Sequence, residues 1–328
     1  MSRPDLAFSR WKFERFVTKR WYSKSPGLLW LLFPLELLYR IVIARKLERP
    51  RISALDPPLV VVGNITAGGT GKTPFVIALI EALQAKGMKV GVISRGYGRT
   101  TRGLRLLSWE STADQVGDEP LLIHERTHVP VCVANDRMAA YEAIKASVDL
   151  VVADDGLQNR HLHRSYEIAL IDSNKGFGNG HCLPLGPLRE PAVRLDTVDV
   201  VVDRADLGGQ GLSMVPSRFC HSVSGEVVDV ADMLERHASI ALVSGIAVPE
   251  RVKSDLSTLG FSVNLRAFPD HHRFEERDFD GLKEPIIVTE KDAVKLPQIA
   301  IDYWIYRADL TLPEGLVDQM LTSLRIKT

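Results

Sequence analysis

The feature that most constrains the fold is an apolar run followed by a glycine-rich turn and a helix-forming stretch. The apolar run is PLVVV (residues 58–62), which is typical of a buried strand in a parallel sheet. The turn reads TAGGTGKT from Thr66 to Thr73, and Pro74 then stands where the first turn of a helix tolerates proline. This order predicts a phosphate-binding loop of the form G-x-x-x-x-G-K-[ST], with Thr66 in place of the first glycine.

The predicted loop supplies the groups that a nucleotide phosphate requires. Its backbone N–H groups and the N-terminus of the next helix would hold phosphate oxygens. Lys72 would reach the outer phosphates and the Thr73 hydroxyl would bind Mg²⁺, so ATP and Mg²⁺ are the expected cofactors. The alternative, a glycine turn with a chance Lys-Thr pair, is disfavoured by the flanking strand and helix. The residues expected to bind the nucleotide are Thr66, Ala67, Gly68, Gly69, Thr70, Gly71, Lys72 and Thr73.

A second apolar run ends in two carboxylates. It reads VDLVVADDG (residues 148–156), the form of a strand that runs beside the phosphate-loop strand and carries Mg²⁺ ligands. Asp154 or Asp155 would bind Mg²⁺ directly or through water. A simple DDG turn is the alternative, and it is less favoured once a phosphate loop lies upstream in the same sheet.

Strand-like and helix-like stretches alternate along most of the chain. Strands are also expected at residues 89–94, 129–134, 149–153, 167–172 and 198–203. This alternation predicts an α/β fold: a P-loop NTPase-like, mostly parallel sheet with helices on both faces, followed by a smaller C-terminal α/β unit. The expected divisions are an N-terminal amphiphilic, membrane-associating segment (1–50), a P-loop core domain (51–215), an extended β linker (216–237) and a C-terminal α/β domain (238–328), with a cleft between the two domains.

Charge is balanced overall but not along the chain. The 41 basic and 41 acidic residues leave no net charge that would point to a nucleic-acid partner. Residues 1–24 alone carry seven basic side chains against two acidic ones, interleaved with aromatic residues. The three cysteines are far apart, which argues against a disulfide framework or a zinc site and fits a reducing compartment.

The basic stretch leads into an apolar segment, GLLWLLFPLELLYRIVIA (residues 27–44). It is just long enough to span a bilayer, but Pro34, Glu36 and Arg40 fall inside it and both flanks are basic. No small-residue cleavage site of a signal peptide follows it. Two alternatives remain: a helix in the membrane interface, which the mixture of basic and aromatic residues favours, and a helix packed on the protein's own core.

Four further loops carry candidate ligand or catalytic groups. Arg95 and Arg99 follow a strand and suit an anionic ligand, and Arg189 and Glu190 stand in a proline-rich, shaped loop. The other two loops offer acids and a histidine doublet, although a solvated helix start and structural histidines are the ordinary alternatives. These loops are SRGYGR (94–99), GDEP (117–120), PLGPLREP (184–191) and FPDHHRF (268–274).

Together these motifs resemble those of the tetraacyldisaccharide 4′-kinase family, lipid A pathway enzymes of Gram-negative bacteria. The resemblance covers most of the chain and accounts for Thr66, since this family has threonine where other phosphate loops have the first glycine. It implies transfer of the γ-phosphate of ATP to the 4′-hydroxyl of a tetraacylated glucosamine disaccharide 1-phosphate, giving lipid IVA. It also implies a peripheral enzyme on the cytosolic face of the inner membrane. We expect a monomer that binds an anionic membrane surface and no nucleic acid. The motifs that carry the resemblance are GNITAGGTGKTP, SRGYGR, GDEP, DDGLQNR, PLGPLREP, DHH and TEKDAVK.

Phosphoryl transfer also needs a group that accepts the proton of the attacking hydroxyl. Because Asp154 and Asp155 are expected to hold Mg²⁺, this base should come from another loop, and the resemblance points to Asp118 as well. His271 would hydrogen-bond Asp118 across the cleft and take up the proton, with His272 or Glu119 as alternatives. The expected catalytic residues are thus Asp118, His271 and Lys72, and the expected substrate contacts are Arg95, Tyr97, Arg99, Glu119, Gln158, Arg189 and Glu190. Among the latter, Arg189 would pair with the substrate's phosphate and Glu190 would accept hydrogen bonds from sugar hydroxyls.

The chain departs from the family pattern DDGxQH at one position. It has Asn159 after Gln158, so the role of that histidine does not carry over, and His161 or His163 is the nearby substitute. Two other functions remain as alternatives: a membrane-associated P-loop GTPase or ATPase switch, and a kinase of a soluble substrate. No guanine-reading [NT]-K-x-D motif supports the first, and the amphiphilic N-terminus speaks against the second.

Overall fold

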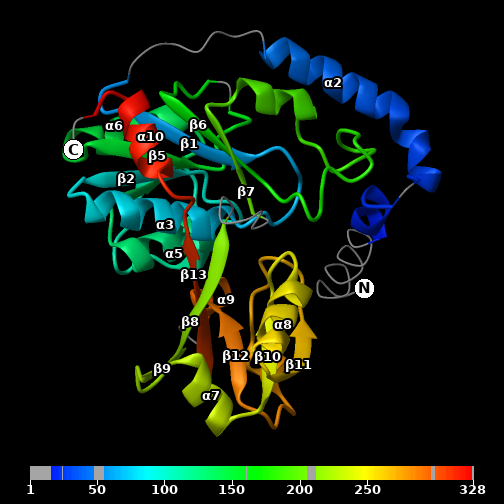
Figure 1. Cartoon of the computed structure of the whole chain (residues 1–328), viewed down its shortest axis with the longest axis vertical. Helices are drawn as coiled ribbons and strands as arrows, with labels where there is room; N and C mark the ends of the chain where they lie inside the picture. Colours follow the sequence, from blue (N-terminus) through cyan, green and yellow to red (C-terminus); the bar gives the residue numbers. More distant parts are fainter. Residues whose placement is uncertain are drawn as a thin grey trace.

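The computed structural model describes residues 16–23, 25–47, 55–159, 161–204, 212–296 and 300–326. These residues form two sheets, one above the other in Figure 1, with helices packed on each. The first sheet has seven strands in the order β3-β4-β2-β5-β1-β6-β7. All of its pairs are parallel except β3 with β4, which confirms the predicted mostly parallel sheet. The bounds are β1 Leu59–Asn64, β2 Val90–Ser94, β3 Arg105–Leu106, β4 Val131–Val133, β5 Leu150–Asp154, β6 Tyr166–Ile171 and β7 Val200–Asp203.

Helices cover both faces of the first sheet because successive strand residues point to opposite sides. Val60 and Val62 of β1 face a core shared with α3 and α5, whereas Leu59 and Val61 face a core shared with α6. Burial of these apolar side chains supplies most of the favourable free energy of such a layer. The helices are α3 (Lys72–Ala85), α4 (Ala113–Val116), α5 (Asp118–Thr127) and α6 (Arg137–Ile144), with short 3₁₀ turns η2 (Lys145–Ser147) and η3 (Ala192–Thr197).

The second sheet has six strands in the order β11-β10-β12-β13-β8-β9. Its first four strands are parallel, and β8 pairs antiparallel with both β13 and β9. The strand bounds are β8 Ser213–His221, β9 Val227–Val228, β10 Ser239–Ser244, β11 Ser262–Ala267, β12 Ile286–Thr289 and β13 Trp304–Thr311. The accompanying helices are α7 (Val230–Arg236), α8 (Pro249–Thr258), α9 (Glu290–Ala293) and the 3₁₀ turn η4 (Glu276–Phe279).

The chain passes between the two sheets more than once, so the elements of each domain come from separate segments of the sequence. The segment predicted as a linker (216–237) contains most of β8 and all of β9 and α7, which belong to the second sheet and its cover. After β13 the chain returns to the first sheet, where α10 (Leu316–Ser323) packs on the α3 side of the core. Figure 1 shows β8 and β13 side by side along the connection between the sheets.

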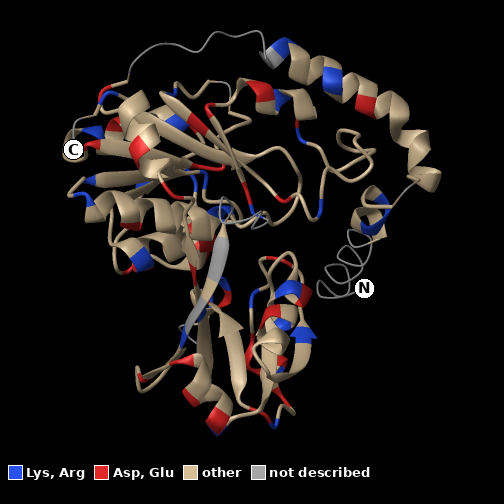
Figure 2. Cartoon of the chain, in the orientation of Figure 1, with Lys and Arg blue, Asp and Glu red and all other residues tan. Residues whose placement is uncertain are grey.

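The N-terminal apolar segment forms a 3₁₀ turn, η1 (Gly27–Leu32), and a helix, α2 (Phe33–Leu47), at the margin of the molecule (Figure 1). Glu36 is 1 % exposed and accepts a hydrogen bond from the Cys182 N–H at 2.8 Å, while the Tyr39 hydroxyl donates to the Arg189 carbonyl at 2.9 Å. The other sides of α2 expose apolar residues and carry few charges (Figure 2). The helix is thus held by its polar side and presents its apolar sides outward.

By length and composition, residues Gly27–Arg45 suffice to cross a membrane. Only 6 % of that window is buried in the protein. Much of the predicted basic, aromatic stretch, up to Arg15, lies outside the described residues. Within the described part, the Trp21 indole N–H donates to the Pro184 carbonyl at 3.0 Å, so the segment before η1 also attaches to the loop that holds α2.

Candidate active site

The phosphate-binding loop lies between β1 and α3, as the sequence predicts. Gly68 and Gly71 have positive φ angles of 106° and 81°, a conformation that side chains disfavour and glycine adopts easily. Thr66 is not among the residues with a positive φ and instead forms a β-bridge with Leu188. A threonine therefore fits the place of the first glycine without backbone strain.

The loop from Pro184 to Pro191 lies against the phosphate-binding loop. The Ala67 N–H donates to the Pro187 carbonyl at 2.7 Å, and the Arg189 N–H donates to the Ile65 carbonyl at 2.7 Å. This backbone pairing places Arg189 beside the nucleotide site rather than in a separate cleft.

Lys72 begins α3 and points to two polar groups of neighbouring strands. Its Nζ lies 3.1 Å from Asn64 Oδ1 and 3.5 Å from Asp155 Oδ1. The Asn64 amide also donates to the Thr66 carbonyl at 2.8 Å, and Gln158 donates to the Asn64 carbonyl at 3.0 Å. Asn64 thereby joins the loop to the lysine, a role that the sequence analysis missed because a single asparagine after a strand gives no pattern.

Asp154 and Asp155 occupy different environments although they are adjacent. Asp154 lies beside Val62 in the β1–β5 register and is 5 % exposed. Its Oδ1 is buried and has no hydrogen-bond partner among the described residues. Burial, and then the charge of Asp155, raise the pKa of Asp154 to about 6.

Asp155 is instead engaged by two cations. Both of its carboxylate oxygens lie 3.0 Å from Arg189 Nη1. Burial would raise the pKa of Asp155, but the charges of Lys72 and Arg189 outweigh it and hold this pKa below its ordinary value. Arg137, another residue that the sequence analysis missed, is buried behind the pair and donates to the Asp154 carbonyl at 3.4 Å.

The unpartnered oxygen of Asp154 fits a divalent cation, because a buried carboxylate oxygen ordinarily has a partner. Among the described residues, no cluster of three or more His, Cys, Asp or Glu residues could hold a metal by itself. Mg²⁺ in nucleotide sites takes few protein ligands and completes its shell with phosphate oxygens and water. The buried, unpartnered oxygen of Asp154 thus fits one protein ligand of such an ion.

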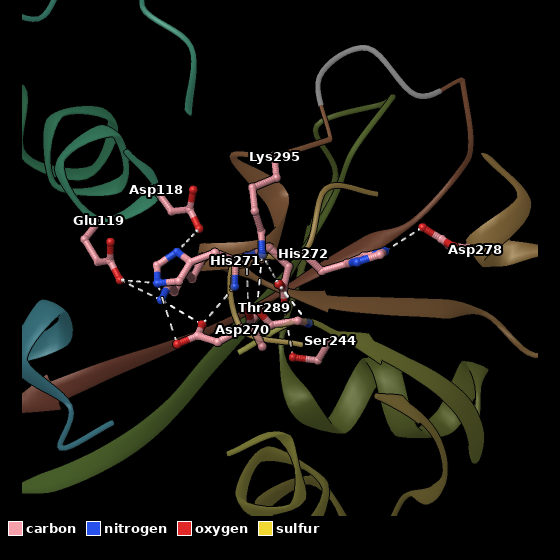
Figure 3. A network of polar contacts seen from close by, with 12 residues as sticks. Asp118, Glu119, Ser244, Asp270, His271, His272, Asp278, Thr289 and Lys295 are labelled. Atoms are coloured by element: carbon pink, nitrogen blue, oxygen red, sulfur yellow. Dashed lines mark hydrogen bonds and ion pairs between the residues drawn. The ribbon is translucent and has the colours of Figure 1, made fainter. Parts of the chain in front are cut away.

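Asp118 and His271 meet across the two domains (Figure 3). Asp118 is the first residue of α5, and His271 follows β11 with a positive φ of 59°. His271 Nδ1 lies 2.9 Å from Asp118 Oδ2. Burial would raise the pKa of Asp118, but the hydrogen bond with His271 and the charge of Lys295 lower it overall. Burial would lower the pKa of His271, but the hydrogen bond with Asp118 raises it overall.

Further charged residues surround this pair. Lys291 Nζ lies 2.6 Å from Glu119 Oε1 and 3.2 Å from Asp270 Oδ1, so Glu119 is paired. His272 points the other way (Figure 3): its Nε2 lies 2.8 Å from Asp278 Oδ2 and its ring stacks on Phe268. His272 therefore has a structural environment and is not a substitute for His271.

The buried Asp292 fixes the backbone that carries His271. Asp292 accepts hydrogen bonds from Ser244 Oγ at 2.8 Å and from the Gly245 N–H at 3.1 Å. Lys295 bridges Asp292 (2.7 Å) and the Gly245 carbonyl (3.3 Å), and the His271 N–H donates to that carbonyl. The TEKDAVK motif contains Asp292 and Lys295, but the sequence analysis gave it no structural role.

The predicted substrate residues fall into three groups. Arg95 and Tyr97 are exposed, and the Tyr97 ring lies 5.0 Å from the His271 ring. Gln158 and Arg189 lie at the nucleotide side, 3.4 Å apart. Arg99 supports its own loop by donating to the carbonyls of Val133 (3.3 Å) and Gly103 (2.8 Å).

Glu190 corrects one expectation. It is 1 % exposed, and its Oε2 lies 3.1 Å from Arg194 Nε. A carboxylate that is buried to this degree is not accessible to sugar hydroxyls in this structure. Its neighbour Arg189 points instead to Asp155, which it contacts at 3.0 Å.

Asn159, which departs from the family pattern, lies in the turn after β5. Its side-chain oxygen accepts a hydrogen bond from the His161 N–H at 3.2 Å. His161 is exposed and His163 is partly buried.

Known proteins match this chain over most of its length. Residues 28–325 match the LpxK family, described as tetraacyldisaccharide-1-P 4'-kinase. A tetraacyldisaccharide 4'-kinase from Alcanivorax borkumensis is 44 % identical over 93 % of this chain and 96 % of its own length. A second, from Azotobacter vinelandii, is 43 % identical over 92 % of this chain and 94 % of its own length. A crystal structure described as LpxK from Aquifex aeolicus in complex with ATP superposes with a TM-score of 0.73 at 26 % identity, covering 90 % of this chain and 99 % of that one.

Proposed function

The chain belongs to the tetraacyldisaccharide 4′-kinase family, and from this premise we propose how its residues perform the reaction. The enzyme is an ATP-dependent lipid kinase of lipid A biosynthesis, which transfers the γ-phosphate of ATP to the 4′-hydroxyl of tetraacyldisaccharide 1-phosphate and yields lipid IVA. The switch GTPase and the soluble-substrate kinase are not favoured. The roles of individual residues are our proposal.

The phosphate-binding loop holds the ATP phosphates through its backbone N–H groups, and Lys72 stabilises the charge that develops on the transferred group. Asp154 and Thr73 would hold Mg²⁺, which when bound would neutralise phosphate charge. Asp155 keeps Lys72 and Arg189 in place, as its contacts of 3.5 and 3.0 Å suggest. We assign Arg189 and Gln158 to phosphate oxygens of the nucleotide, because both lie beside the phosphate-binding loop.

Asp118 orients the 4′-hydroxyl and accepts its proton as the bond to phosphorus forms, and His271 takes that proton up. The observation that carries this role is the 2.9 Å contact between two groups of different domains, set beside the exposed Tyr97. We assign Arg95 and Tyr97 to the polar part of the lipid substrate because both are exposed on this side.

The pairing of Asp118 with His271 is tested by a double-mutant cycle. Asp118→Ala and His271→Ala should each lower kcat strongly while ATP affinity stays nearly unchanged. The double variant should lose much less than the product of the two single losses, because members of one catalytic unit are not additive. Multiplicative losses would mean that the residues act separately. Lys72→Ala serves as the reference that disables the nucleotide side, and near-normal activity in a folded Lys72→Ala protein would refute that assignment.

We further propose that the enzyme lies peripherally on the cytosolic face of the inner membrane, bound to its anionic surface. The exposed apolar sides of α2 and the nearby cations Lys19, Arg20 and Arg45 support this location. Each cation near an anionic surface contributes about 1 kcal/mol, so deletion of residues 1–24 or high salt should shift the protein toward the soluble fraction. We also propose a monomer, since one chain supplies both the phosphate-binding loop and the Asp118–His271 pair.

A further inference from the structure

A group of cations beside the phosphate-binding loop has no role in the mechanism above. Arg204 directly follows β7, and a Cβ added to Gly71 would lie 3.1 Å from its Nη1. Lys175 Nζ lies near Gly68, 3.8 Å from the corresponding Cβ position. Arg251 of α8 reaches over from the second domain and pairs with Asp172 at 3.0 Å.

Arg204 lacks a bonded counter-ion among the described residues. Its Nε is buried without a hydrogen-bond partner, and its guanidinium forms no ion pair with any residue that the structure describes. Asp172 acts on it only through space, because the contact of that carboxylate is with Arg251. Burial lowers the pKa of Arg204 to about 10, which still leaves the side chain charged near neutral pH. A partly buried cation without a bonded acid favours an anionic ligand.

The sheet order indicates which part of the nucleotide this cation meets. The carboxyl ends of β5, β1, β6 and β7 lie at one edge of the sheet in that order. Asp154, Asp155 and Lys72 gather on the β5 side of the phosphate-binding loop, where phosphate is transferred. Arg204 stands on the opposite side, at the end of β7, beside the glycine that precedes Lys72. It therefore faces the part of ATP that is not transferred.

We propose that Arg204 binds the α- and β-phosphates of the nucleotide and so sets the affinity for ATP and for the product ADP alike. This inference rests on the proposed function, in which the phosphate-binding loop holds ATP. A guanidinium can donate two hydrogen bonds to phosphate oxygens, which a lysine cannot match. Because the contact is the same before and after transfer, it contributes uniform binding and leaves the chemical step unchanged.

The test compares Arg204→Gln with a matched control, Arg236→Gln, which removes an exposed arginine of the second domain paired with Glu226 at 2.7 Å. Equilibrium binding of MgATP, MgADP and adenosine is measured calorimetrically on the full chain. Arg204→Gln should weaken MgATP and MgADP by the same factor, about 10- to 100-fold, as expected for a lost hydrogen bond to a charged group. Adenosine binding should not change, KM for ATP should rise while kcat is kept, and Arg236→Gln should behave as wild type.

Unchanged affinity of Arg204→Gln for both nucleotides would overturn the inference, as would a loss confined to MgATP, which would place Arg204 at the γ-phosphate. If Arg204→Gln does not fold, Arg204→Lys, which keeps the positive charge, is used in the same binding measurements. It should weaken both nucleotides equally, and wild-type affinity for both would overturn the inference. If Lys72→Ala loses turnover while Arg204→Gln keeps wild-type nucleotide affinity, the inference about Arg204 is rejected and the proposed function stands. A wild-type chain that binds neither nucleotide would reject the proposed function.

Discussion

At the scale of single residues, the two adjacent aspartates at the end of β5 have different environments. Asp154 has a buried oxygen without a partner among the described residues, whereas both oxygens of Asp155 contact Arg189. A metal ion bound by Asp155 would have to compete with that arginine. The asymmetry supports our proposal that Asp154 is the direct Mg²⁺ ligand and that Asp155 orients Lys72 and Arg189.

We therefore predict that Asp154→Asn raises the Mg²⁺ concentration needed for half-maximal turnover much more than Asp155→Asn does. Asp155→Asn should mainly lower kcat, because Lys72 and Arg189 lose their shared anchor. The measurement is a Mg²⁺ titration of turnover at saturating ATP, with the exposed Asp302→Asn as control. A larger shift in Asp155→Asn would reverse the assignment.

The second residue-scale prediction concerns pH. The pKa of His271 is raised above its ordinary value near 6.5. The stability that its contact with Asp118 contributes is therefore fully present below about pH 6.5 and is lost as pH rises through the raised pKa. Because a proton-accepting His271 must be neutral, turnover should rise over the same range, with a midpoint above about pH 6.5.

Asp118→Asn should move this titration to lower pH, since it removes the carboxylate that raises the pKa of His271. The neighbours Asp270 and Glu119 also raise this pKa and Lys291 lowers it, so the shift should be partial. Titration of the His271 ring protons by NMR measures it directly and does not depend on activity. A midpoint that stays in place would show that Asp118 does not set the protonation of His271.

At the scale of elements, the proline-rich loop from Pro184 to Pro191 joins the nucleotide site to α2. It pairs with the phosphate-binding loop through its backbone and accepts hydrogen bonds from Trp21 and Tyr39. Glu190 anchors it to the core through Arg194.

We expect Glu190→Ala to lower the free energy of unfolding by about 3 kcal/mol, because it leaves the buried Arg194 without one of its partners. Urea unfolding measures the change, and Asp196→Ala, an exposed acid of the neighbouring turn, serves as control. A loss similar to that of the control would show that the buried pair does not hold the loop.

The helix α2 carries the second element-scale prediction. Leu31 and Leu35 are 79 % and 54 % exposed, so changing both to glutamate should scarcely affect folding. It should, however, weaken binding to anionic vesicles, since each leucine that enters the interface contributes about 1.5–3 kcal/mol. Cosedimentation with vesicles measures binding, and KM for the lipid should rise more than KM for ATP. Val223→Glu, 74 % exposed on the second domain, is the control. Equal cosedimentation of all variants would remove α2 from the membrane contact.

At the scale of the whole molecule, a group of ion pairs other than the Asp118–His271 contact joins the two domains. Arg126 of α5 contacts Glu290 of α9 at 2.7 Å and Asp309 of β13 at 2.7 Å. Arg307 also contacts Glu290 at 2.9 Å. On the catalytic side, Gly69 of the phosphate-binding loop faces Ala247 of the second domain. The position of His271 therefore depends on how the domains are held.

Arg126→Ala should lower kcat roughly 10- to 100-fold, because a small displacement of the second domain misplaces His271. ATP affinity should fall little, since the loop that holds the phosphates lies in the first domain. Small-angle scattering should report a larger radius of gyration. Arg218→Ala, an exposed arginine 3.8 Å from the same Asp309, is the control. Wild-type turnover in Arg126→Ala would show that this ion-pair group does not align the domains.

The sequence by itself determined the local features of this protein. The β1 strand, the glycine loop and the start of α3 follow from hydrophobic pattern, glycine conformation and proline position, which act over a few residues. The alternation of strands and helices likewise predicted the parallel sheet, and the motifs predicted the family. The catalytic roles of Asp118 and His271 stay predictions, although the structure places the two side chains 2.9 Å apart.

Only the tertiary structure decided which polar groups are paired and which are available. Arg189, 34 residues away in the chain, contacts Asp155, whereas a buried oxygen of Asp154 has no partner among the described residues. Glu190 is withdrawn from the site by burial, Glu36 turns one side of an apolar helix toward the protein, and Arg204 comes to lie beside Gly71. The physical reason is that burial and counter-ions come from residues distant in the chain. The free-energy cost of leaving a charged side chain unpaired therefore depends on tertiary contacts. The local sequence does not determine it.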